Sequence, residues 1–253
     1  MFDLDGVVYV GSVPVDGAAS AMLELRDRGW QLLFATNNSS KTPTSVTEVL
    51  RDRAGISVDP SAVITSGMAA AVYLRNNGLE SAYVLGSPQL KDTVETYGVA
   101  VVESSTPDAV LVGLDRSLTY DKIDQAARAV RNGAAFVATN TDPTFPTSTG
   151  EVPGAGTIVA AVATASGSRF VTCGKPERPM IDLVSERIVT ERVVMVGDRP
   201  ETDTAFAIAA GWESVLTLTG VTATADDIPR HLVPNHVVAS VAELPGILDG
   251  SSQ

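Results

Sequence analysis

The sequence predicts an α/β fold with a doubly wound parallel-sheet core and an inserted, smaller α/β cap domain. Short apolar runs alternate with amphipathic segments along the 253 residues, and this β-α-β order favours parallel strands joined by right-handed crossovers. The apolar runs are nearly continuous, which is typical of strands covered on both faces. Because the predicted strands outnumber those of a usual open sheet, we expect two sheets.

Each predicted strand is a short run rich in Phe, Leu, Ile, Val or Ala. In chain order these runs are Phe2–Leu4, Gln31–Ala35, Ala62–Thr65, Ala82–Leu85, Val99–Val102, Ala109–Val112, Ala135–Ala138, Arg169–Thr172, Val193–Val196, Val215–Leu218 and His236–Val238. Apolar residues three and four apart predict helices. The clearest of these helices are Ala18–Arg28, Pro43–Arg53, Asp121–Arg131 and Pro200–Ala210.

Two polar segments, Arg75–Gly78 and Ala165–Ser168, have the composition of hinges. We therefore expect a core made of residues 1–78 and 169–253, and a cap domain made of residues 79–168. Within the cap, Thr147–Pro153 is polar and turn-like, so no strand is expected there. Without a preceding strand, Gly154-Ala155-Gly156 does not qualify as a dinucleotide-binding fingerprint.

The composition excludes several classes of function. With 18 Lys and Arg against 30 Asp and Glu, the net charge is −12, which argues against a nucleic-acid partner or a polybasic membrane contact. No apolar run approaches the ~20 residues of a membrane helix. A single cysteine, Cys173, excludes an intrachain disulfide framework and a cysteine zinc cage. Because the N-terminus lacks a basic, apolar leader, we expect a cytoplasmic protein.

The first polar cluster is a pair of carboxylates, Asp3 and Asp5, that emerges from an apolar run. Residues two apart in a strand begin on the same face, and two neighbouring carboxylates need a cation, a shared proton or water. A solvated turn would also explain the pair. An EF-hand calcium loop would not, because Val7, Tyr9 and Gly11 supply no carboxylate.

Three further polar clusters follow predicted strands. The loop Thr36-Asn37-Asn38-Ser39-Ser40 offers hydroxyl, amide and backbone N–H donors for an anion, or an ordinary helix cap. Lys175, after a glycine, is either a phosphate contact or a solvated surface lysine. Asp198 ends a very apolar strand and Asp203 follows it, where acidic residues also favour a helix start.

All four clusters lie where a strand ends. In doubly wound sheets, ligands bind outside the carboxyl ends of the strands. We therefore expect the aspartates, the Thr-Asn loop and the lysine to converge on one edge of the sheet. Carboxylates together with a phosphate-binding loop suit Mg²⁺ and a phosphoryl group.

The four motifs, in this order, resemble those of the haloacid dehalogenase-like phosphatases. The motifs are Asp3-Leu4-Asp5-Gly6-Val7, Thr36-Asn37-Asn38, Gly174-Lys175-Pro176 and Gly197-Asp198-Arg199 through Thr202-Asp203. More narrowly, the chain resembles the type-IIA capped branch, which includes NagD-like and p-nitrophenyl-phosphatase-like proteins. The resemblance implies a magnesium-dependent phosphatase that hydrolyses a small organic phosphomonoester through an aspartyl-phosphate.

The resemblance also implies a role for each motif residue. Asp3 is the expected nucleophile and Asp5 the general acid and base. Mg²⁺ would be held by Asp3, the backbone carbonyl of Asp5 and Asp198, with Asp203 orienting a metal-bound water or Lys175. The residues expected to bind the substrate phosphate are Thr36, Asn37, Asn38 and Lys175.

The cap is expected to cover the site and to contact the leaving group. Asn140, Thr141, Asp142 and Phe145 are the residues expected to face the cleft, although a surface turn would explain them equally. The partner is then a small phosphorylated metabolite, and caps of this branch can also mediate homodimers. Two other functions remain open at this point, namely phosphomutase-type phosphoryl transfer and a non-enzymatic sensor of a phosphate ligand.

Overall fold

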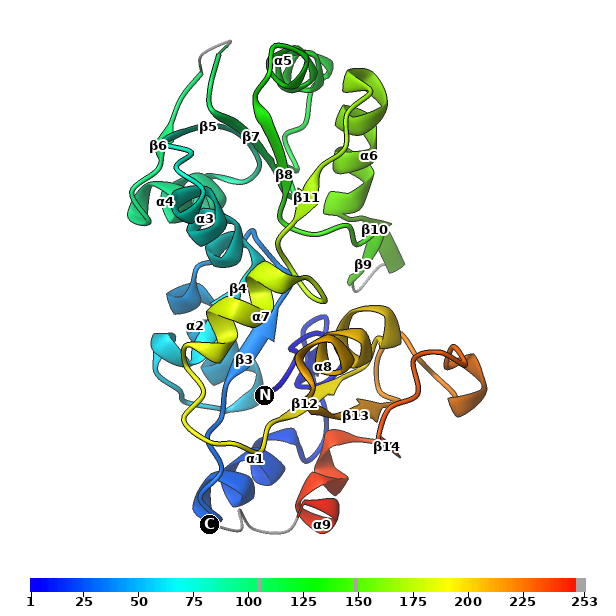
Figure 1. Cartoon of the computed structure of the whole chain (residues 1–253). Coiled ribbons are helices and arrows are strands. Elements are labelled where there is room, and N and C mark those ends of the chain that lie inside the picture. The colour runs from blue at the N-terminus through cyan, green and yellow to red at the C-terminus, as the bar shows by residue number, and fades with distance from the viewer. Residues whose placement is uncertain (104–105, 148–149, 249–253) are drawn as a thin grey trace.

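The computed structural model describes residues 1–103, 106–147 and 150–248, and within these it contains two parallel sheets (Figure 1). The strands of the first sheet are, in spatial order, β4 (Val63–Thr65), β3 (Phe34–Thr36), β12 (Val194–Gly197), β13 (Glu213–Thr217) and β14 (His236–Val238). Phe2 lies between β3 and β12 and bridges Phe34 and Val196. The predicted strand Phe2–Leu4 is therefore too long. The Leu4 carbonyl instead accepts hydrogen bonds from the N–H groups of Val7 and Val8, which turn the chain away from the sheet.

The second sheet is also parallel. Its strands are, in spatial order, β11 (Val171–Thr172), β8 (Ala135–Ala138), β7 (Ala109–Val112), β5 (Ser81–Leu85) and β6 (Ala100–Val101). The last strand along the chain, β11, follows residue 168 and is hydrogen-bonded to β8. Together the two sheets confirm the predicted α/β fold class.

Side chains that alternate along each strand pack against helices on both faces of each sheet. Phe34 and Val196 of the first sheet lie in one apolar cluster, whereas Ala35 and Met195 lie in another. The first cluster includes side chains of α1 (Ala18–Asp27), α2 (Pro43–Ala54) and α9 (Leu244–Ile247). The second includes side chains of α3 (Ser66–Asn76), α7 (Arg178–Ser185) and α8 (Ala205–Ala210). Burial on both faces explains why the strands are almost continuously apolar.

The second cluster continues into the second sheet and packs the two sheets into one structure. Ala82 and Val84 of β5 belong to it, with Leu90 of α4 (Pro88–Thr96). The opposite face of the second sheet packs against α5 (Tyr120–Arg131) and α6 (Ala155–Ser166). The helix α3 contacts both α4 and α7, so it joins the two sheets.

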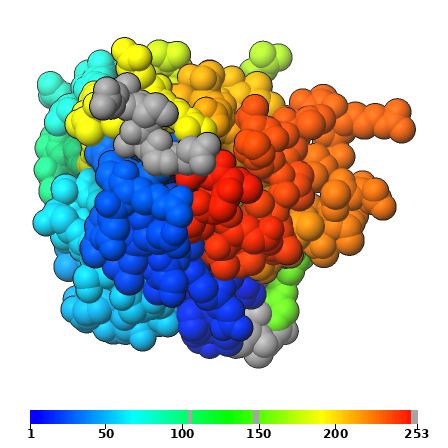
Figure 2. Space-filling model, turned by 90° about the horizontal axis from the view of Figure 1, so that it is seen from below, coloured from blue at the N-terminus to red at the C-terminus, as the bar shows by residue number. Residues whose placement is uncertain are grey.

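The helix α1 and the C-terminal helix α9 lie side by side at the end of the molecule opposite the second sheet (Figure 1). Figure 2 shows the N-terminal segments in blue next to the C-terminal segment in red, in agreement with the contacts between α1 and α9. Arg28 donates hydrogen bonds to the carbonyls of Pro245 and Leu248, which ties the C-terminal segment to the end of α1. No described helix has the length and apolar character needed to cross a membrane.

The main error in the predicted elements lies in the cap. Within Thr147–Pro153, expected to be a turn, Thr147 and Gly150–Pro153 form strand pairs in an antiparallel hairpin of β9 (Thr144–Thr147) and β10 (Gly150–Pro153); residues 148 and 149 lie outside the described part of the chain. A second short hairpin pairs β1 (Tyr9–Val10) with β2 (Val13–Pro14). The predicted helix Pro200–Ala210 begins with a π-helical turn, Pro200–Thr204, before α8.

Candidate active site

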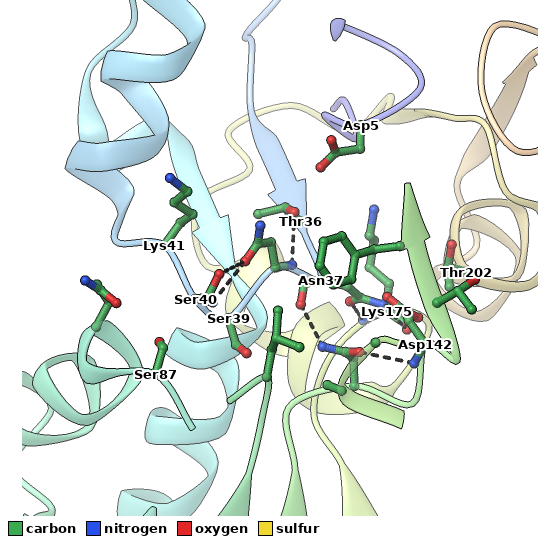
Figure 3. Close-up of a pocket in the computed structure, with 18 of the residues that line it drawn as sticks. Asp5, Thr36, Asn37, Ser39, Ser40, Lys41, Ser87, Asp142, Lys175 and Thr202 are labelled. Carbon is green, nitrogen blue, oxygen red and sulfur yellow. Dashed lines mark hydrogen bonds between the residues drawn. The ribbon is translucent and has the colours of Figure 1, made fainter. Parts of the chain in front are cut away.

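A cavity of about 870 Å³ lies where the strands of the first sheet end and the cap covers them. Among the residues predicted to act together, those that line this cavity are Asp3, Asp5, Thr36, Asn37, Asn38, Lys175 and Asp198. Asp203 does not line the cavity but accepts a hydrogen bond from the Lys175 ammonium group. Figure 3 shows Lys41 and Ser87 on one side of the pocket and Lys175, Asp142 and Thr202 on the other, with Asp5 above them.

Lys175 is a buried cation held between two carboxylates. Its ammonium group donates to Asp3 Oδ1 at 2.6 Å and to Asp203 Oδ1 at 2.7 Å, and only 3% of the residue is exposed. Burial lowers the pKa of Lys175, but the charges of Asp203 and Asp3 outweigh burial and raise that pKa above its usual value. Lys175 is therefore charged and fixed in position at the floor of the pocket.

Asp203 has both carboxylate oxygens occupied. Its Oδ1 atom accepts from Lys175, and its Oδ2 atom accepts from the backbone N–H groups of Asp198 (3.2 Å) and Arg199 (3.1 Å). The π-helical turn carries Asp203 back onto the end of β12. A Cβ atom at Gly197 would overlap the Asp203 carboxylate, so this close approach requires glycine.

Three buried or half-buried carboxylates converge beside Lys175. Oxygens of Asp3, Asp198 and Asp203 lie within 4.8 Å of one another. Burial, followed by the charge of Asp203, raises the pKa of Asp198 to about 7. Burial also raises the pKa of Asp3 above its usual value, and the charges of Asp203 and Asp198 add to this against the opposing effect of Lys175.

This arrangement fits a divalent cation. Lys175 supplies one positive charge to three carboxylates, and burial, with the repulsion between these carboxylates, raises the pKa values of Asp3 and Asp198. The backbone N–H of Val221 donates a hydrogen bond to Asp198 Oδ2 at 2.6 Å, and this bond orients the carboxylate. Oxygen ligands of this kind suit Mg²⁺.

Asp5 differs from the other aspartates because its carboxyl group has no hydrogen-bond or ion-pair partner in the described part of the chain. It lines the pocket. Burial raises its pKa, although Arg53, Lys175 and Lys41 act in the opposite direction. A partnerless carboxyl with a raised pKa can hold a proton nearer to neutral pH and release it to a ligand.

The Thr-Asn loop forms a network around Asn37. The Asn37 side chain accepts from the backbone N–H of Lys175 at 2.8 Å and donates to the Lys175 carbonyl at 3.1 Å. It also donates to Asp142 Oδ1 at 3.2 Å. The Asn37 carbonyl accepts from Ser66 and Asn140 (2.6 and 2.7 Å). Asn37 therefore connects the core loop, the cap and the segment that carries Lys175.

The rest of the Thr-Asn loop is ordered by local bonds. Thr36 Oγ1 accepts from the backbone N–H of Asn38 at 3.1 Å, and Asn38 Oδ1 accepts from the N–H (2.9 Å) and hydroxyl (2.7 Å) groups of Ser40. Thr36 is 4% exposed, so the loop presents its polar groups to the pocket rather than to bulk solvent.

The cap residues expected at the cleft divide into two groups. Asn140, Asp142 and Phe145 line the pocket, whereas Thr141 is exposed and is not part of the described lining. Two pocket residues that sequence reasoning missed are Lys41 and Arg116. Arg116 lies in the loop between β7 and α5, and its place beside Phe145 depends on the hairpin that was predicted to be a turn.

Comparisons with known proteins agree with this geometry. A family model described as haloacid dehalogenase-like hydrolase matches residues 1–100, and a second, described as HAD-hydrolase-like, matches residues 172–244. An acid sugar phosphatase from Staphylococcus aureus (strain USA300) is 37% identical over 238 residues, which are 92% of this chain and 91% of the relative.

Solved structures with the same fold include two phosphatases. A glycerol phosphate phosphatase from Mycobacterium tuberculosis in complex with magnesium superposes with a TM-score of 0.89 at 33% identity, over 96% of this chain and 75% of that one. A 4-nitrophenylphosphatase from Thermotoga maritima superposes with a TM-score of 0.88 at 35% identity, over 96% and 94% of the two chains.

Proposed function

Because the chain belongs to the haloacid dehalogenase-like hydrolases and is a phosphatase of that family, we propose that it hydrolyses a small organic phosphomonoester in a Mg²⁺-dependent reaction. The observation that carries this proposal is the meeting of Asp3, Asp198 and Lys175 beside the partnerless carboxyl of Asp5. Phosphoryl transfer needs groups that bind the phosphate and a metal ion, a nucleophile and a general acid. These residues would supply all of them.

Asp3 is the proposed nucleophile. Lys175 holds its Oδ1 atom at 2.6 Å and favours the ionised form, which leaves Oδ2 to attack phosphorus. The new bond from Asp3 to phosphorus forms as the bond to the leaving oxygen breaks, giving an aspartyl-phosphate. The Thr36 hydroxyl, the backbone N–H of Asn37, the side chain of Asn38 and the Lys175 ammonium would hold the non-bridging oxygens.

Asp5 is the proposed acid and base. Its proton passes to the leaving oxygen in the first half of the reaction. In the second half, Asp5 accepts a proton from the water that attacks phosphorus, and the bond from Asp3 to phosphorus breaks. The raised pKa of Asp5, caused by burial, favours the protonated form that the first step requires.

Asp3, the backbone carbonyl of Asp5 and the side chain of Asp198 would hold Mg²⁺. Bound there, the cation would neutralise the repulsion between the carboxylates and the substrate phosphate. Asp203 accepts hydrogen bonds on both oxygens, from Lys175 and from two backbone N–H groups. Its proposed role is to position Lys175 and the backbone at Asp198.

We assign residues 1–78 and 169–253 to the core and 79–168 to a cap that excludes water and contacts the leaving group. The cavity of about 870 Å³ has room for an organic leaving group in addition to the phosphate. Names of the relatives, acid sugar phosphatase and glycerol phosphate phosphatase, agree with a leaving group the size of a small sugar or polyol.

The test is the release of inorganic phosphate from p-nitrophenyl phosphate, with Mg²⁺ and with a chelator. Turnover should require Mg²⁺, and Asp3→Asn should abolish it. Asp16→Asn, the same change at a site outside the pocket, should leave turnover unchanged. Acid-quenched protein should carry a phosphoryl group on the peptide that contains Asp3. Turnover of Asp3→Asn near that of the unmodified protein would refute the assigned nucleophile.

A further inference from the structure

Two further cations, Lys41 and Arg116, line the pocket, and both residues are exposed. Lys41 follows the Thr-Asn loop, and Arg116 lies in the loop before α5; both line the cavity. Neither side chain forms an ion pair or a hydrogen bond with any residue that the structure describes. Figure 3 shows Lys41 on the side of the pocket opposite Lys175, whereas Asp5, Thr36 and Asn38 lie beside Lys41 in a second, smaller hollow.

The acid next to Arg116 in sequence does not neutralise it. Asp115 is 5% exposed and is held at 2.7 Å by the Lys122 ammonium and by the backbone N–H and hydroxyl groups of Ser117. Burial alone would raise the pKa of Asp115, but these hydrogen bonds outweigh burial and lower it. Asp115 is therefore paired with Lys122 and not with Arg116. Arg116 forms no ion pair with a described residue.

Arg116, although exposed, contacts an aromatic ring of the cap. Its guanidinium carbon lies 5.4 Å from the centre of the Phe145 ring, in the range of a cation–π contact. Phe145 comes from the β9–β10 hairpin, so two separate cap segments meet at this contact. Stacking occupies a face of the guanidinium and leaves its N–H edge available to an oxyanion.

We propose that Arg116, stacked on Phe145, selects phosphomonoesters whose leaving group carries a second negative charge, such as a carboxylate. The inference deepens the proposed phosphatase function and rests on it. The physical basis is that an unpaired cation in a partly enclosed pocket attracts an anion more strongly than it attracts a hydroxyl group.

The test compares two substrates that differ at one carbon. Racemic 3-phosphoglycerate and racemic glycerol 3-phosphate have three carbons each, and they differ by a carboxylate in place of a hydroxymethyl group. We expect kcat/KM to be higher for 3-phosphoglycerate by about tenfold or more. This ratio corresponds to one charge-assisted hydrogen bond between Arg116 and the substrate carboxylate. Arg116→Met should reduce this ratio to near one, and Arg116→Lys, which keeps the charge without the planar fork, should retain part of it.

Arg128→Met is the matched control. Arg128 is another exposed cap arginine, but it pairs with Asp124 and does not line the pocket. This variant should keep the substrate ratio of the unmodified protein. Circular dichroism of each variant establishes that the cap is folded.

The outcomes separate the inference from the phosphatase function. Equal or better hydrolysis of glycerol 3-phosphate by the unmodified protein would overturn the inference and leave the phosphatase function standing. A preference for 3-phosphoglycerate that persists in Arg116→Met would remove Arg116 from this role. Failure to hydrolyse p-nitrophenyl phosphate as well would refute the proposed function, and the inference would fall with it.

Discussion

The stability of the metal-free protein should depend on the protonation of Asp198. Burial, with the nearby charge of Asp203, raises the pKa of Asp198 to about 7 from an ordinary value of 3.8. A carboxyl whose pKa is higher in the folded state binds its proton more tightly when folded. Its contribution to stability is therefore greatest below the ordinary pKa and is lost as the pH rises towards 7. A difference of about three pKa units corresponds to about 4 kcal/mol in the free energy of unfolding.

The assay is urea unfolding in the presence of a chelator, from about pH 4 to about pH 8, on the unmodified protein and Asp198→Asn. Other groups in the pocket also titrate. The result to compare is therefore the difference in the free energy of unfolding between the two proteins at each pH. The amide introduced by this substitution can still accept from the backbone N–H of Val221 and carries no charge. Relative to the unmodified protein, Asp198→Asn should therefore become more stable as the pH rises, by up to about 4 kcal/mol.

Addition of Mg²⁺ at the upper end of this range provides the second half of the test. The cation should stabilise the unmodified protein, because it replaces the proton as the balancing charge, and should stabilise Asp198→Asn much less. A free-energy difference between the two proteins that stays constant across the pH range would refute the reasoning. Equal stabilisation of both by Mg²⁺ would place the cation away from Asp198.

Three other substitutions test the geometry of the site. Lys175→Met leaves the carboxylates of Asp3 and Asp203 without their cation, and should lower the free energy of unfolding by about 3–5 kcal/mol at neutral pH without metal; unchanged kcat/KM would contradict its place in catalysis. Asn37→Asp loses the donor to the Lys175 carbonyl and should lower kcat for p-nitrophenyl phosphate by about tenfold or more, measured against Asn132→Asp, an exposed site outside the pocket. Gly197→Ala should cost about 1–3 kcal/mol in urea unfolding, because its Cβ atom overlaps the Asp203 carboxylate; a cost near zero would mean that this turn adjusts freely.

Local patterns in the sequence were sufficient for the fold class and for most of the strands. The runs Ala109–Val112 and Ala135–Ala138 match observed strands residue for residue, because strands in the interior of a sheet that is covered on both faces must be apolar. The run His236–Val238 also matches, although β14 is an edge strand with two exposed residues. The polar clusters that end the strands were also visible, since each stands in a short stretch of the chain.

Two parts of the pocket could not be predicted in this way. The residues of β10 are exposed or only partly buried, so no apolar pattern marks the strand, and pairing with β9 depends on backbone hydrogen bonds. Asn37 contacts Asp142 and Lys175, which are 105 and 138 positions further along the chain, and no local pattern encodes such a contact. The position of Arg116 was missed for the same reason, because it depends on that unpredicted hairpin.

The role of Asn37 follows from where Lys175 lies in the chain. Lys175 comes three residues after β11, which is hydrogen-bonded to the second sheet, yet its ammonium group binds Asp3 and Asp203 at the first sheet. A shift of the cap would therefore pull on the segment that carries Lys175. The two hydrogen bonds between the Asn37 side chain and the Lys175 backbone hold that segment to the loop after β3. Asn37 also bonds two cap residues, Asp142 at 3.2 Å and Asn140 at 2.7 Å, so this one side chain and its carbonyl tie the Lys175 segment, the core loop and the cap together.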